Sequence, residues 1–137
     1  MRQFLIIVFF SLLFILPSHS QINETGLPFI NNYTINDYNA GTQNWSIVQD
    51  KRGIIYVANK LGVLQYDGLT WQLLKLTNGS DVFSLAIDNN DIVYVGAKSE
   101  FGFLAPDSLG RLNYQSLSMH VDSTHRDFGT VTTIIAD

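Results

Sequence analysis

The sequence predicts an all-β protein made of repeated four-stranded units, and three observations support this prediction. Segments 45–50 and 54–58 recur as 83–88 and 92–96, at a constant offset of 38 residues. Short runs rich in β-branched and aromatic residues alternate with turn residues. No helical periodicity of apolar residues occurs after the first 20 residues. The core is therefore expected to form where similar sheets stack on one another.

The N-terminus has the three zones of a secretory signal peptide. A basic start at Arg2 precedes an apolar run of 13 residues at 4–16, interrupted by one serine. This run is shorter than the about 20 residues that a bilayer-spanning helix needs. Residues 1–20 are therefore expected to form a signal helix, with cleavage between Ser20 and Gln21 because a small side chain precedes the cut.

A lead-in segment at 21–42 is followed by the first repeat unit, residues 43–79. Asp50 and Gly53 suit a type I turn, and the Asp67-Gly68 pair signals a second tight turn. Residues 54–58, directly after Gly53, are all apolar or aromatic. This pattern is expected for a strand whose two faces are both packed against other parts of the protein. The four strands of this unit are expected at 45–49, 54–58, 62–66 and 71–76.

The second unit, residues 80–118, has the same order of elements. Its first turn carries Asp91 where the first unit has glycine, and a two-residue insertion is expected near Glu100. A loop at 119–130 follows, and 131–137 repeats the start of the second unit, so these last residues are expected to be the first strand of a third unit. The strands of the second unit are expected at 82–87, 92–96, 101–105 and 112–117.

Four short strands per unit of roughly 40 to 45 residues is the spacing of a β-propeller. The predicted fold is an incomplete β-propeller: two four-stranded antiparallel blades plus the first strand of a third, after the signal helix. A β-sandwich of eight strands is the alternative, although a sandwich does not need duplicated units. Two blades cannot close a ring, so the reading frame is expected to continue beyond this fragment into further blades.

The motif Asp50-x-x-Gly53-Ile54-Ile55-Tyr56-Val57-Ala58 is followed by Gly62-Val63-Leu64-Gln65-Tyr66-Asp67-Gly68-x-x-Trp71. In order and spacing the two resemble blades of the two-component regulator propeller family of Bacteroidetes-type bacteria. Asp91, Thr130 and Thr132 depart from the family pattern and weaken the match at the start of the third blade. Further similar segments are 28–33, 43–45, 94–96, 100–104 and 126–129.

The resemblance implies the periplasmic sensor region of a hybrid histidine kinase or of a propeller regulator with a helix-turn-helix output. Members of this family continue into a sandwich rich in tyrosine motifs, one membrane helix and the output domain. The present chain would then be an exported segment on the periplasmic side of the inner membrane, in a protein that is a homodimer at full length. Its partner would be a small nutrient ligand such as an oligosaccharide, and no cofactor is expected.

Composition excludes some partners. The net charge is -4 and the pI about 5.1, with no cluster of Lys or Arg, so this segment has no positive field to hold nucleic acid or an anionic membrane. Without cysteine, the chain has neither disulfide bonds nor a lipid-modified cysteine after the signal.

Four residues are predicted to contact a ligand: Glu100, Phe101, Arg126 and Asp127. Glu100 is expected in the insertion that the first unit lacks, next to Phe101, where a loop can face the axis, and Arg126 and Asp127 precede the third unit in a similar way. Loops on a rigid scaffold often carry function. A salt bridge between blades is the competing interpretation.

Other candidate sites have simpler explanations. His120, Asp122 and His125 could offer metal ligands, but their segment lacks helical spacing to arrange them, so a polar loop between blades is preferred. The regular positions of five aromatic residues favour core packing over stacking on sugars; these are Trp45, Tyr56, Tyr66, Trp71 and Tyr94. No catalytic constellation or metal site is predicted, so the chain is not expected to be an enzyme. The alternatives are a secreted propeller enzyme acting on polysaccharides, which would need paired carboxylates, and a structural or adhesion propeller.

Overall fold

The computed structural model describes Gly26 and residues 29–137. The predicted signal helix and the cleavage site between Ser20 and Gln21 lie outside the described residues. The chain divides into two units, Met1–Asn31 and Asn32–Asp137, and every helix and strand below belongs to the second. Across 29–137, no helix is both long enough and apolar enough to cross a membrane.

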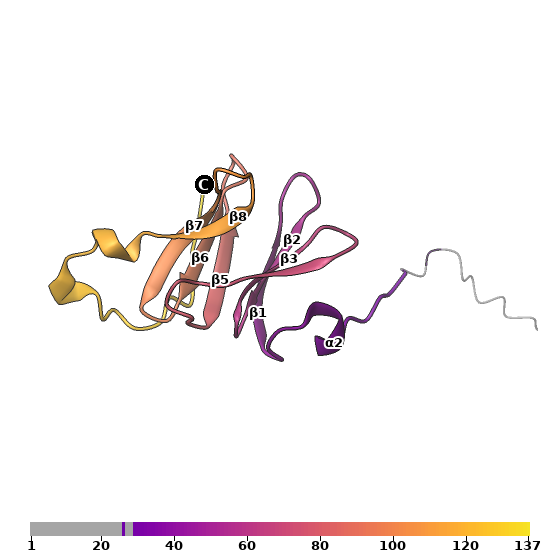
Figure 1. Cartoon of the computed structure of the whole chain (residues 1–137), viewed down its shortest axis with the longest axis horizontal. Coiled ribbons are helices and arrows are strands. Elements are labelled where there is room, and N and C mark those ends of the chain that lie inside the picture. Colours follow the sequence, from indigo (N-terminus) through magenta and orange to yellow (C-terminus); the bar gives the residue numbers. More distant parts are fainter. Residues whose placement is uncertain (1–25, 27–28) are drawn as a thin grey trace, which may run out of the picture. The chain divides into compact units, whose positions relative to one another are not determined.

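Eight strands form two separate antiparallel sheets of four strands each (Figure 1). Sheet A has the order β1-β2-β3-β4 and sheet B the order β5-β6-β7-β8. The strands of sheet A are β1 (Asn44–Gln49), β2 (Ile55–Asn59), β3 (Gly62–Tyr66) and β4 (Trp71–Leu74). Those of sheet B are β5 (Val82–Ile87), β6 (Val93–Ala97), β7 (Glu100–Pro106) and β8 (Leu112–Ser116). The prediction of an all-β chain with two four-stranded antiparallel sheets is confirmed, and consecutive strands pair within each sheet rather than interleaving.

The two sheets share details beyond their strand order. Each has an irregularity at the same place in its first strand, before Ser46 in β1 and before Ser84 in β5. Tyr56 in β2 and Tyr94 in β6 are equivalent, and each directs its hydroxyl group toward the aspartate of the preceding turn. The repeat read from the sequence therefore corresponds to a repeat in three dimensions.

The turns between the first two strands of each sheet have the same shape although their sequences differ. Asp50 Oδ1 accepts hydrogen bonds from two backbone N–H groups in its turn, and Asp88 Oδ1 does the same. Gly53 has a φ of 87°, and Asp91 takes this place in the second turn with a φ of 63°. Aspartate tolerates this left-handed region better than most residues, so the missing glycine leaves the turn intact.

The strand register corrects the expected place of the insertion. Glu100 pairs with Ala97 across a two-residue turn, as Gly62 pairs with Asn59 in sheet A. Glu100 is therefore the first residue of a strand, not part of a loop that the first unit lacks. The additional residues lengthen β7, which has 7 residues where β3 has 5.

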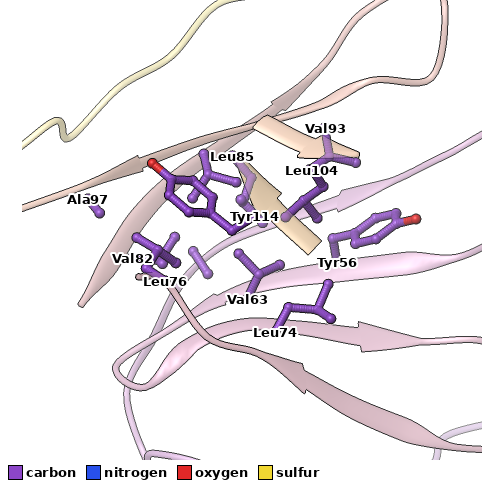
Figure 2. Close-up of a cluster of buried hydrophobic side chains, with 12 residues drawn as sticks. Tyr56, Val63, Leu74, Leu76, Val82, Leu85, Val93, Ala97, Leu104 and Tyr114 are labelled. Atoms are coloured by element: carbon purple, nitrogen blue, oxygen red, sulfur yellow. The ribbon is translucent and has the colours of Figure 1, made fainter. Parts of the chain in front are cut away.

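The core lies between the sheets and joins faces that are not equivalent (Figure 2). From sheet A, Tyr56 and Ala58 enter this core. Their equivalents in sheet B, Tyr94 and Gly96, are absent from it, because side chains alternate along a strand and these two point to the opposite face. Sheet B instead contributes the other face of its strands, including Val82, Leu85, Val93, Val95, Ala97, Leu104 and Tyr114.

The last residues, 131–137, form no strand, contrary to the sequence prediction. A strand needs a hydrogen-bonded neighbour. Among the described residues, the backbone of this segment pairs with sheet B only at its start, by a bond of 3.0 Å from Val131 N–H to the carbonyl of Ala97, next to the bridge between Thr130 and Lys98. The hydroxyl group of Ser84 also donates to the carbonyl oxygen of Val131, at 2.9 Å. The segment thus begins against the face of sheet B that points away from sheet A.

Candidate functional site

Glu100 and Phe101, two of the four predicted ligand contacts, lie at one end of sheet B beside the turn between β6 and β7, and the loop that carries the other two approaches this end. Phe101 meets the ring of Phe128 edge-on, with centroids 5.7 Å apart. The N–H of Ser99 donates to the carbonyl of Gly129. These contacts bring the loop that holds Arg126 and Asp127 next to the start of β7.

Glu100 is buried, with 7% of its surface exposed. Its Oε1 atom accepts four hydrogen bonds from donors around the same strand end. Three come from hydroxyl groups, those of Tyr114 at 2.8 Å and of Ser116 and Ser118 at 2.7 Å each, and the fourth comes from the N–H of Phe101 at 3.1 Å. Glu100 therefore organises a polar cluster within the protein, and its contact with a ligand stays a prediction.

The protonation of Glu100 follows from this cluster. Burial disfavours the charged carboxylate, but the hydrogen bonds from Ser118, Ser116 and Tyr114 outweigh it and hold the pKa of Glu100 below its usual value. The carboxylate is consequently ionised at neutral pH. Burial, together with the hydrogen bond to this carboxylate and its charge, raises the pKa of Tyr114.

The other three predicted residues are more accessible. Phe101 is half-buried, whereas Arg126 and Asp127 are exposed. Arg126 donates from Nε to the carbonyl of Val121 and from its terminal nitrogen to that of Met119, each at 3.0 Å, so its side chain fastens its own loop. The remaining N–H groups of Arg126 and the carboxylate of Asp127 are the polar groups that a ligand could reach here.

The histidine segment adopts a local structure of its own. Ser118–His120 and Ser123–His125 are short 3-10 helices, and Asp122 Oδ1 caps the second by accepting from Thr124 N–H at 2.9 Å. Within the described part of the chain, no three acidic, histidine or cysteine side chains gather as a metal site would require.

The five aromatic residues of the repeats occupy different environments. Tyr56 is buried in the core between the sheets, at 1% exposed, whereas Trp45 is 41% exposed. Tyr66 and Trp71 stack with centroids 4.5 Å apart. Tyr33 and Tyr38, from the segment around the short helix α2 (Ile35–Tyr38), pack against this pair, a contact that sequence reasoning did not foresee.

A cleft of about 740 Å³ opens between the two sheets at their opposite end, and it was missed at the sequence level. It lies beside the β1–β2, β5–β6 and β7–β8 turns. A sequence signal for it exists, because Gln65 and Gln72 place amides at neighbouring positions of otherwise largely apolar strands. Residues from both sheets line it: Arg52, Tyr56, Gln65, Gln72, Asn90, Asp91, Ile92, Leu104, Pro106, Gly110, Arg111 and Leu112.

Comparison with known proteins finds no match: no family model, no curated protein and no solved structure matches this chain. The functional interpretation therefore depends on the residues and geometry described above.

Proposed function

We propose that this chain is the opening part of a ligand-sensing β-propeller in a membrane-spanning signal-transduction or transcription regulator. Each sheet is then one blade, and the ligand is a nutrient, such as an oligosaccharide, met on the periplasmic side of the inner membrane. The family resemblance of the Asp50 and Asp67 motifs supports the sensing role.

One observation carries the propeller interpretation: each sheet is covered on the same face by the chain that follows it. Sheet B covers the face of sheet A that holds Ala58. The start of the C-terminal segment covers the equivalent face of sheet B, since a Cβ atom added at Gly96 would lie 2.7 Å from Val131 Cγ1. In a β-sandwich the inner faces of two sheets pack together, and no further sheet joins the core. When each sheet instead covers the same face of the preceding sheet, the packing can continue from blade to blade.

The gene provides the first test. Beyond the codon for Asp137 we expect an uninterrupted frame encoding more copies of the Asp-x-x-Gly blade motif, then a tyrosine-rich sandwich, a membrane helix and a kinase or helix-turn-helix output. A frame that encodes further blades but neither membrane helix nor output domain would favour a secreted propeller and contradict the sensing proposal.

Localisation and assembly provide the second test. Cell fractionation should place the full-length product in the inner membrane with its blades accessible from the periplasm, and N-terminal sequencing should begin at Gln21. Light scattering of the detergent-solubilised protein should give the mass of a homodimer. Recovery in the cytosol with residues 1–20 still attached would contradict export.

A further inference from the structure

One residue that lines the cleft between the sheets, Gln65, has a buried polar atom without a partner. Gln65 Oε1 is buried and accepts no hydrogen bond in the described structure. Gln65 pairs with Gln72 in the neighbouring strand β4, and both residues line the cleft. A buried carbonyl oxygen without a donor is destabilising, because it has lost its hydrogen bonds to water. If the Gln65 side chain turns so that this oxygen faces the cleft, a hydroxyl group of a bound molecule would satisfy it.

Two guanidinium groups line the cleft with part of their charge already compensated. Arg52 donates from Nε and Nη2 to Asp50 Oδ2, at 3.0 and 2.7 Å. Arg111 donates from Nε to Asp107 Oδ2 at 3.1 Å. Each arginine keeps further N–H groups for a ligand, because guanidinium carries five. With the carboxylate of Asp91 also in the lining, the site has no excess of positive charge to attract an anion.

The aliphatic residues of the lining come from the part of the chain that forms sheet B. Ile92, Leu104, Pro106 and Leu112 contribute hydrocarbon surface beside the amides and guanidinium groups. A site with dispersed donors and acceptors next to apolar surface suits a molecule that has hydroxyl groups and C–H faces together. The volume lies in the range of about 300–1,000 Å³ that is typical of small-molecule sites.

At the rim of the cleft, hydrogen bonds join a turn of sheet A to a turn of sheet B and fix the position of these turns relative to each other. Lys51 N–H donates to Asp91 Oδ1 at 3.3 Å, and the Lys51 ammonium group donates to the carbonyl of Asn89. These bonds join the β1–β2 turn of sheet A to the β5–β6 turn of sheet B. A ligand would therefore meet a site that is already formed.

We propose that this cleft binds an uncharged, hydroxyl-rich ligand of the saccharide class, with Gln65 and Gln72 as its principal hydrogen-bonding residues. This inference rests on the proposed sensing function and assigns to it a site distinct from Glu100, Phe101, Arg126 and Asp127. Those four lie at the other end of the sheets.

The test is calorimetric titration of the whole chain with neutral trisaccharides (xylotriose, mannotriose, cellotriose and maltotriose) and with two acidic probes, trigalacturonate and inorganic sulfate. We expect at least one neutral trisaccharide to bind and the acidic probes to bind more weakly or not at all. Gln65→Leu and Gln72→Ala should each weaken binding by about tenfold or more, since each removes a hydrogen bond to the ligand.

Gln115→Ala is the matched control, because Gln115 pairs with Phe103 in sheet B at the position equivalent to the Gln65–Gln72 pair and does not line the cleft. It should leave affinity within about twofold. Gln65→Leu should not lower the unfolding midpoint, since it removes an unpartnered amide. Gln72→Ala, at an exposed position, tests the site even where the Gln65 variant fails to fold.

The outcomes separate this inference from the proposed function. Absence of binding by every neutral trisaccharide, tighter binding of an acidic probe, or binding unchanged in the Gln65 and Gln72 variants would each overturn the cleft assignment and leave the sensing proposal standing. A reading frame without membrane helix and output would overturn the sensing proposal whatever the cleft binds.

Discussion

The hydroxyl group of Tyr114 donates a 2.8 Å hydrogen bond to Glu100 Oε1, joining the middle of β8 to the first residue of β7 in the buried space beside sheet A. Tyr114 itself is 9% exposed and belongs to the core between the sheets. The sole buried acidic residue in the described part of sheet B is thus tied directly to the apolar core.

Replacing this carboxylate should destabilise the protein in a pH-dependent way. Glu100→Gln should lower the free energy of unfolding by about 2 kcal/mol at neutral pH, because the amide replaces a charged acceptor and adds a donor that meets the same hydroxyl groups. The folded-state pKa of Glu100 is lowered, so its contribution is present above the unfolded pKa, about 4.3, and is lost as pH falls through the folded pKa. Urea unfolding at pH 7 and at lower pH measures both effects.

Asp127→Asn is the control for that variant. Asp127 is exposed, and no hydrogen bond of its side chain occurs in the described structure, so its replacement should leave the unfolding curve unchanged. Equal losses for Glu100→Gln and Asp127→Asn would show that the hydrogen-bonded cluster adds nothing to stability.

The turn aspartates should differ in importance although they are equivalent in the repeat. Asp50 is 5% exposed; burial opposes its ionisation, but the side chain of Arg52 and the N–H of Ile54 keep its pKa below the usual value. Asp50→Asn should therefore cost about 2 kcal/mol. Asp88→Asn should cost less, because Asp88 is more exposed and has no arginine partner. Thermal unfolding of the two variants side by side gives the order, and a larger loss for Asp88 would contradict the prediction.

Gly96 should be intolerant of any side chain. A Cβ atom there would lie 2.3 Å from Ser84 Oγ and 2.7 Å from Val131 Cγ1, whereas Ala58 holds a Cβ at the equivalent place in sheet A. Gly96→Ala should displace the segment after Gly129 and speed hydrogen exchange at the Val131 amide, which mass spectrometry of peptides can follow.

A substitution in the same segment controls for that experiment. Ile135 is 86% exposed, so Ile135→Ala should leave exchange at Val131 unchanged. Protection of Val131 that survives in Gly96→Ala would show that the segment does not depend on this close approach.

The aromatic group on sheet A predicts a fluorescence change. Tyr33 contacts Trp71 edge-on at 5.3 Å and its hydroxyl group lies 2.7 Å from that of Tyr66. In a Trp45→Phe background, Tyr33→Ala should expose Trp71 and shift its emission to longer wavelength, whereas Tyr33→Phe should keep the ring contact and the emission. A red shift of equal size in both would mean that the hydroxyl contact, not ring packing, covers Trp71.

Local patterns in the sequence were sufficient for most of the fold. The bounds of β3 and β5 agree with the prediction, because alternating apolar residues and turn aspartates specify a strand within a few residues of chain. The prediction misplaced the insertion because it aligned Gly62 with Gly102 by residue type. In the structure, Gly62 is equivalent to Glu100, because each follows a two-residue turn and begins its strand. This strand register cannot be read from residue types. The strand expected at 131–137 is absent for a related reason. Its residues favour a strand, but a strand also needs a neighbouring strand to hydrogen-bond with, and the sequence of this segment alone does not provide one.

By itself, the sequence determined that the chain forms repeated all-β units, since periodicity and turn chemistry act over neighbouring residues. Only the tertiary structure decided what the polar residues do. It placed Glu100 among Tyr114, Ser116 and Ser118, and it opened a cleft beside Gln65. Both results depend on which faces of two sheets meet, and that choice comes from packing and register between residues far apart in the chain.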